Sequence, residues 1–101
     1  MAYGRRVTDG KLLLVAIVEM AEGHAEAGQR YEDEVLALLP RHGGTLDRRM
    51  RATDAPTEVH VIRFASRAGL ESFMVDPDRL ALRDKLGDAA PTTRVIEVRD
   101  V

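Results

Sequence analysis

An unbroken apolar segment from Leu12 to Val18 constrains the fold more than any other feature of this sequence. The segment ends at the charged residue Glu19 and is far shorter than the roughly 20 apolar residues that a membrane-spanning helix needs. A run of this length, rich in branched side chains, is typical of a strand covered on both faces by other parts of the protein. The sequence therefore predicts a central β-strand at this position.

Arg5 and Arg6 precede this segment, and paired arginines before an apolar run also occur in twin-arginine export leaders. The run is at the lower limit of length for a leader, and no small-residue cleavage site follows it. We therefore interpret the segment as a buried strand. A cytoplasmic protein without a membrane partner is the expectation.

The chain is long enough for one domain and too short for two independent cores, since it has 101 residues, of which 45% are apolar. We expect a flexible arm over residues 1–10 and a single domain over residues 11–101. The net charge of −2 argues against a nucleic-acid partner. The absence of cysteine excludes disulfides, thiolate nucleophiles and cysteine-bound metals.

Hydrophobic periodicity and capping residues predict the helices. The first is expected over residues 24–39, with Glu32 among the charged residues of its solvent-facing side. Its apolar face consists of Ala27, Tyr31, Val35 and Leu38. Two further helices are expected, one capped by Ser66 and one by Asp76, which precedes a proline. The last of these helices is expected to bury Leu80, Leu82 and Leu86 and to end at Gly87.

Three more segments are predicted to be strands, over residues 45–53, 58–65 and 92–99. Alternation in the first of them places Met50 on an apolar face with Leu46. The same segment holds Arg48, Arg49 and Arg51. We interpret these arginines as edge-strand charges that block aggregation, with phosphate binding as the alternative.

The order strand, helix, strand, strand, helix, strand predicts an α+β fold of the ferredoxin-like split βαβ type. Its four-stranded antiparallel sheet has the order 4-1-3-2 and carries both helices on one face. The other face, which would hold Val59 and Val61, is then uncovered, so we expect a homodimer formed through the sheet face. Arg63 lies on that face and needs an anionic partner, either Glu19 or Glu97 of a second copy; an anion clamp between subunits is the alternative.

Residues 11–99 resemble the dimeric α/β-barrel superfamily. The segments that carry the resemblance are Tyr31-Glu32, Leu36-Ala37-Leu38-Leu39, His42-Gly43-Gly44-Thr45-Leu46, Glu58-Val59-His60-Val61-Ile62-Arg63-Phe64-Ala65-Ser66 and Asp76-Pro77. The set is similar to small bacterial families of unassigned function and to antibiotic-biosynthesis monooxygenase-like proteins. The superfamily includes cofactor-independent monooxygenases, polyketide cyclases, lactone isomerases, haem-degrading enzymes and proteins without known chemistry, so the resemblance leaves the function open.

The resemblance implies a ligand cleft between the sheet and its own helices. The residues expected to line it with apolar surface are Val35, Met50, Ile62, Phe64, Leu70, Phe73 and Met74. A small apolar or aromatic ligand suits such a cleft. His60 is the candidate base for a phenolic or enolisable substrate, with Tyr31 and His24 assisting. The alternative is a non-catalytic ligand-binding or interaction dimer, in which side chains fill the cleft and a carboxylate or the backbone holds His60.

Metal and cofactor sites are not expected. His24 and His42 lie at opposite ends of the first predicted helix, so they cannot bind one metal ion within a single subunit. The sequence also contains neither Trp nor Asn, which relatives that degrade haem or form quinones commonly use. We therefore expect an enzyme without a bound cofactor, if the protein is an enzyme at all.

Overall fold

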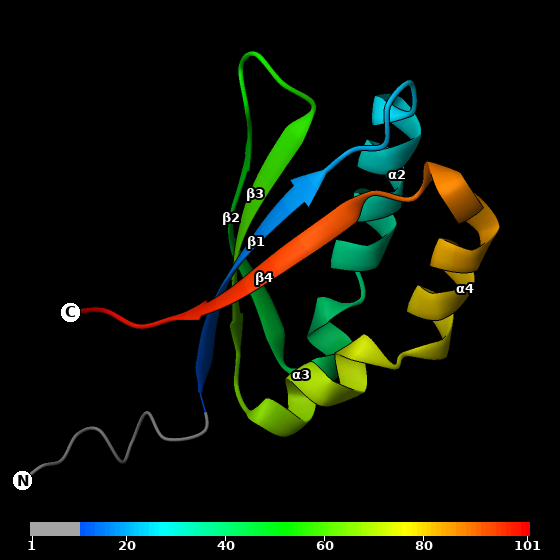
Figure 1. The fold of residues 1–101 in the computed structure, drawn as a ribbon. Coiled ribbons are helices and arrows are strands. Elements are labelled where there is room, and N and C mark those ends of the chain that lie inside the picture. The colour runs from blue at the N-terminus through cyan, green and yellow to red at the C-terminus, as the bar shows by residue number, and fades with distance from the viewer. Residues whose placement is uncertain (1–10) are drawn as a thin grey trace, which may run out of the picture.

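The computed structural model describes residues 11–101, so the arm expected over residues 1–10 lies outside the described part of the chain. Four strands and the helices form two layers (Figure 1). The strands are β1 (Leu12–Glu19), β2 (Gly44–Arg51), β3 (Thr57–Phe64) and β4 (Thr92–Val98). The helices are α2 (Ala25–Leu36), α3 (Arg67–Met74) and α4 (Pro77–Leu86), with short 3-10 turns η1 (Leu39–His42) and η2 (Gly87–Ala89).

The sheet is antiparallel throughout and has the order β2-β3-β1-β4, which confirms the predicted order. Figure 1 shows α2, α3 and α4 on the same side of this sheet. The central strands β1 and β3 are the two whose sequences are apolar on both sides. The ferredoxin-like α+β fold predicted from the sequence is therefore the observed one. Within residues 11–101, no helix is long and apolar enough to cross a membrane.

Local signals start α3 and α4 as expected, whereas α2 ends at Leu36, before the predicted end at residue 39. The Ser66 side chain accepts a hydrogen bond from the Gly69 amide at 3.1 Å and starts α3. Asp76 accepts a hydrogen bond from the Asp78 amide at 2.8 Å and starts α4, whose first residue is proline. Gly43 has a φ of +71° and ends η1, because a residue without a side chain adopts this left-handed backbone at little cost.

Two predictions about which helix residues are buried are wrong. Leu80 is 43% exposed, because it lies on the outer side of α4, and only Leu82 and Leu86 of that helix pack against the core. Glu32 is 5% exposed, although the sequence analysis placed it on the wet side of α2. It belongs to a second inward-facing row of α2, formed with Gly28 and Leu36 at spacings of four residues.

A β-bulge in β2 overturns the faces predicted for that strand. Leu46 pairs with Ile62, and Arg48 already pairs with Val61, so Asp47 is the extra residue. Because side chains alternate between faces along a strand, one extra residue moves every later side chain to the opposite face.

The bulge therefore corrects the placement of three residues. Met50 pairs with Val59 on the face away from the helices, so it cannot line a cleft between sheet and helices. Arg49 and Arg51 instead face the helices. The interpretation of these two arginines as edge-strand charges is therefore wrong, since both pair with a buried glutamate described below.

The side of the sheet opposite the helices, here called the rear face, carries partly buried apolar side chains. They are Leu13, Val15, Ile17, Met50, Val59, Val61, Ile96 and Val98. Arg63 on this face is paired with Asp47, the bulge residue, at 3.0 Å. The expectation that Glu19 or a second copy's Glu97 pairs with Arg63 is therefore wrong, since Glu97 pairs with Arg67 of its own chain.

Candidate functional site

A cavity of about 480 Å³, here called the main cavity, lies between the sheet and the helices. Its wall is formed by Leu14, Ala16, Val18, Tyr31, Glu32, Val35, Leu36, His60, Ile62, Phe64, Leu70, Phe73, Met74, Arg79, Arg83, Thr93 and Val95. This volume is within the range of small-molecule sites. Eight of the ten residues predicted from the sequence as site residues are on this wall, and His24 and Met50 are not.

The space arises at the middle of the central strand β1. Ala16 is cross-strand neighbour to His60 on one side and to Val95 on the other. Leu14 and Val18, its neighbours on the same face, are larger, so the small side chain leaves room beneath the helices. Val95 lines the cavity and is 50% exposed, which places the cavity opening beside the edge strand β4.

His60 is held by a carboxylate on its own strand. Its Nε2 lies 2.8 Å from Oε1 of Glu58, two residues earlier on the same face of β3. Glu58 is fully buried and also accepts hydrogen bonds from Arg49 Nε at 2.8 Å and from Arg51 Nη2 at 2.7 Å. The sequence analysis did not predict this cluster, because the two arginines reach Glu58 only through the bulge.

The charge state of Glu58 sets the orientation of the His60 proton. Burial opposes ionisation of Glu58, but hydrogen bonds from Arg49, His60 and Arg51 outweigh it and lower the pKa of Glu58 to about 2. An ionised carboxylate only accepts hydrogen bonds, so Nε2 of His60 carries the proton and donates it. Nδ1 is then the ring nitrogen left for a ligand.

Glu32 is the second titratable group on the cavity wall, and the sequence analysis missed it as well. Burial, reinforced by the negative charge of Glu58, raises the pKa of Glu32 to about 7, although nearby arginines oppose the rise. No ion pair holds Glu32 within the described residues. A carboxyl group with a pKa near neutrality can act as an acid, a base or a hydrogen-bond donor. Its spacing of four from Gly28 and Leu36 was the signal in the sequence.

Tyr31 and His24 lie in different environments. Tyr31 is buried and lines the main cavity, next to Glu32 on α2. His24 precedes α2 as its N-cap residue, makes no side-chain capping bond and is exposed. The structure therefore brings Tyr31 and His60 to one cavity and leaves His24 outside it. Contrary to the prediction, His24 is therefore not placed to assist His60 in the cavity.

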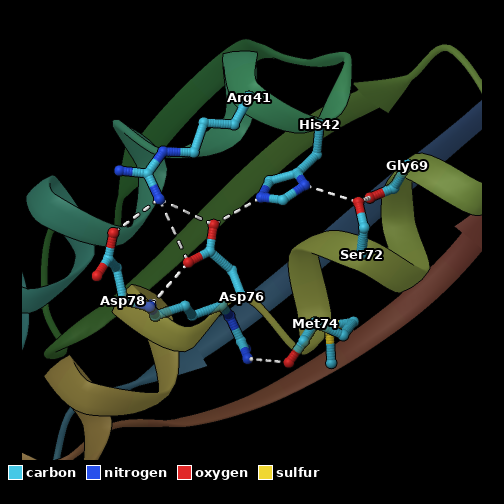
Figure 2. Close-up of polar contacts among 8 residues, drawn as sticks. Arg41, His42, Gly69, Ser72, Met74, Asp76 and Asp78 are labelled. Atoms are coloured by element: carbon cyan, nitrogen blue, oxygen red, sulfur yellow. Dashed lines mark hydrogen bonds and ion pairs between the residues drawn. The ribbon is translucent and has the colours of Figure 1, made fainter.

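A second polar cluster joins η1 to α3 and α4 (Figure 2). His42 Nδ1 lies 2.6 Å from Ser72 Oγ, and Nε2 lies 2.7 Å from Asp76 Oδ2, an order of groups that also occurs in hydrolytic triads. Ser72, however, also donates to the Gly69 carbonyl, and Asp76 caps α4 and pairs with Arg41. None of the three lines the main cavity, so we assign the cluster to the packing of helices.

No protein-family model matches the sequence, and neither does any curated protein. Solved structures do match. A proposed antibiotic biosynthesis monooxygenase from Nitrosomonas europaea is 14% identical with a TM-score of 0.73, covering 91% of each chain. SnoaB from Streptomyces nogalater, a cofactor-independent oxygenase, is 13% identical with a TM-score of 0.70, covering 91% of this chain and 96% of its own. A Pseudomonas aeruginosa protein is 20% identical with a TM-score of 0.71, covering 91% and 95%. The chain therefore has the ferredoxin-like fold of the antibiotic biosynthesis monooxygenase-like proteins.

Proposed function

We propose that this protein binds a small aromatic ligand in the main cavity and acts on it without a bound cofactor, by chemistry that begins with removal of a proton. The observation that carries the proposal is the placement of His60, which is 1% exposed and lines the main cavity while Glu58 holds its Nε2. The matching fold of SnoaB, a cofactor-independent oxygenase, supports the same reaction class. Oxygenation, cyclisation or isomerisation of a phenolic or enolisable substrate would each start in this way.

Each polar group of the cavity has a separate role in this proposal. Nδ1 of His60 takes a proton from the substrate, and the ionised Glu58 stabilises the resulting imidazolium. Glu32, protonated in part of the molecules near neutral pH, donates a hydrogen bond to the substrate oxygen on which charge develops. Tyr31 lies next to Glu32 and orients the ring. Apolar walls from Phe64 and others keep water from the reacting atoms.

The alternative is a non-catalytic ligand-binding or interaction dimer whose cleft is filled by side chains and whose His60 is held by a carboxylate or the backbone. Glu58 meets the expectation for His60. Phe64, Phe73 and Met74 would have to fill the space above His60 in that case. They instead line a cavity that reaches His60, and Met74 is 44% exposed. This arrangement favours ligand binding.

We expect His60→Gln to lower kcat/KM for oxidation of 1,8-dihydroxyanthrone, an enolisable phenol, by dissolved dioxygen at least 100-fold, because positioned bases contribute factors of about 100 to 10,000. Product formation is followed by its visible absorbance, and thermal unfolding confirms that the variant folds. Ser72→Ala, in the second polar cluster, is the matched control and should leave turnover unchanged. A folded His60→Gln variant with activity within threefold of the parent would contradict the proposal.

We also propose that the rear face is the interface of a homodimer. Its apolar side chains lie on all four strands, and all described helices are on the other side of the sheet (Figure 1). A contiguous apolar surface of this kind marks an interaction site, and a second copy with the same surface satisfies it through a two-fold axis.

Val15→Asp is expected to convert the dimer into a monomer, because Val15 lies at the centre of the rear face between its cross-strand neighbours Val61 and Ile96. A buried, unpaired carboxylate in each subunit would oppose association. Light scattering at micromolar concentration should give about twice the chain mass of 11.2 kDa for the parent and that mass itself for the variant. The control is Val75→Asp, which places the same charge at a position that is 65% exposed on the helical side and should remain dimeric. A parent protein that is a folded monomer would refute the interface.

A further inference from the structure

Two arginines of α4 line the main cavity one helical turn apart. Arg79 lies with its guanidinium carbon 5.2 Å from the centre of the Phe73 ring and donates to the Met74 carbonyl at 3.1 Å. Arg83 donates to the Pro91 carbonyl at 3.2 Å. Each guanidinium group has five N–H donors, so one backbone hydrogen bond leaves most of them unused.

Neither arginine is neutralised by a carboxylate of the described residues. Five arginines within residues 11–101 form no ion pair there, and of these only Arg79 and Arg83 line the main cavity; the others are Arg48, Arg94 and Arg99. The Nε atom of Arg79 is buried and has no hydrogen-bond partner among residues 11–101. Buried donors of this kind are rare in proteins and call for an explanation.

The carboxyl groups that face the helices from the sheet and α2 do not cancel the charge of Arg79 and Arg83. Glu58 pairs with Arg49 and Arg51, and Asp33 pairs with Arg49, so both carboxylates already have partners. Glu32 is near both Arg79 and Arg83, but burial raises its pKa to about 7. Below that pH most Glu32 side chains are protonated and carry no charge. This side of the cavity, where Arg79 is partly buried and Arg83 is exposed, therefore has an excess of positive charge next to apolar walls, which strengthen electrostatic attraction relative to bulk water.

We propose that Arg79 and Arg83 bind the carboxylate of an aromatic acid whose ring occupies the apolar part of the main cavity. The inference rests on the proposed function and narrows its substrate class. A guanidinium group is planar and matches a carboxylate with two parallel hydrogen bonds. The apolar residues Ile62, Phe64 and Phe73 supply the surface against which a ring packs.

The test compares 2-naphthoate with 2-naphthamide, a neutral compound of the same shape, by isothermal titration calorimetry at pH 6, where Glu32 is mostly protonated and naphthoate is ionised. We expect naphthoate to bind at least tenfold more tightly, since its charged group meets two unpaired guanidinium groups. Arg83→Gln and Arg79→Gln should each weaken naphthoate binding at least tenfold and change naphthamide binding less than twofold. Lys85→Gln is the matched control, because it removes a positive charge from the same helix outside the main cavity, and it should change neither.

The outcomes separate this inference from the proposed function. Equal binding of the two compounds, or an Arg83→Gln variant that binds naphthoate like the parent, overturns the carboxylate site and leaves ligand binding in the cavity intact. Failure of both compounds to bind the parent protein overturns both proposals. Arg79 also packs on Phe73, so if Arg79→Gln loses both compounds through misfolding, the result with Arg83→Gln decides.

Discussion

Replacing Glu58 by Gln should lower the free energy of unfolding at pH 7 by about 3 kcal/mol, because it removes the buried carboxylate that pairs with two inward-facing arginines and with His60. The pKa of Glu58, lowered from 4.5 to about 2, leads to a similar figure of roughly 3 kcal/mol at about 1.4 kcal/mol per unit. A fully buried group is not screened by solvent, so the effect should far exceed that of a surface ion pair.

The pH dependence identifies the cause of this effect. A carboxyl group with a lowered pKa stabilises the fold above its unfolded value of 4.5, and this contribution is lost as the pH falls toward 2. Urea unfolding should therefore show a gap between parent and Glu58→Gln that is full at pH 7 and narrows below pH 4.5. Glu97→Gln, which breaks the exposed pair with Arg67, is the control and should cost less than about 1 kcal/mol. A gap that does not change with pH would show that Glu58 acts through packing rather than charge.

The fold was predictable because several independent signals agreed. The apolar run of β1, the caps Ser66 and Asp76 and the glycine at position 43 each determine local structure through backbone geometry or burial, whatever the rest of the chain does. Strand order then follows from the order of the elements. The cavity wall was also largely predictable, since residues such as Ile62 and Phe64 alternate regularly along β3.

The polar part of the site was not predictable in the same way. The bulge at Asp47 has no glycine or proline to mark it, and its single extra residue decides which face Arg49 and Met50 occupy. An alternation pattern assumes regular pairing, so it placed Met50 in the cleft and left Glu58 without partners. Partners that lie on different strands become visible only when the register is known.

Glu32 illustrates a second limit. A charged residue on a helix is normally exposed to solvent. Four neighbouring charged residues of α2 are exposed in this way. Glu32 differs from Asp33 and Glu34 only in sharing the row of Gly28 and Leu36, which α2 turns toward the sheet. Its burial costs stability, and residues that oppose stability in this way are frequent at functional sites.

Glu32→Gln is expected to stabilise the protein, by about 3 kcal/mol at pH 8. The pKa of Glu32 is raised from 4.5 to about 7, so the folded state binds a proton that the unfolded state has lost, and stability of the parent falls as the pH rises from 4.5 to 7. Gln carries no charge at any pH and avoids this loss. Urea unfolding should therefore give nearly equal stabilities at pH 4 and a gap of about 3 kcal/mol at pH 8.

Glu34→Gln, an exposed position on the same helix, is the control for Glu32→Gln and should change stability by less than about 0.5 kcal/mol at either pH. If Glu32→Gln were instead destabilising at pH 8, the Glu32 carboxylate would have to be ionised and paired with Arg79 and Arg83 in the folded protein. Those arginines would then already hold an internal anion, and a ligand carboxylate would have to displace it. The same measurement therefore tests two claims. The first is that burial of Glu32 destabilises the fold, and the second is that Arg79 and Arg83 are free to bind the carboxylate of a ligand.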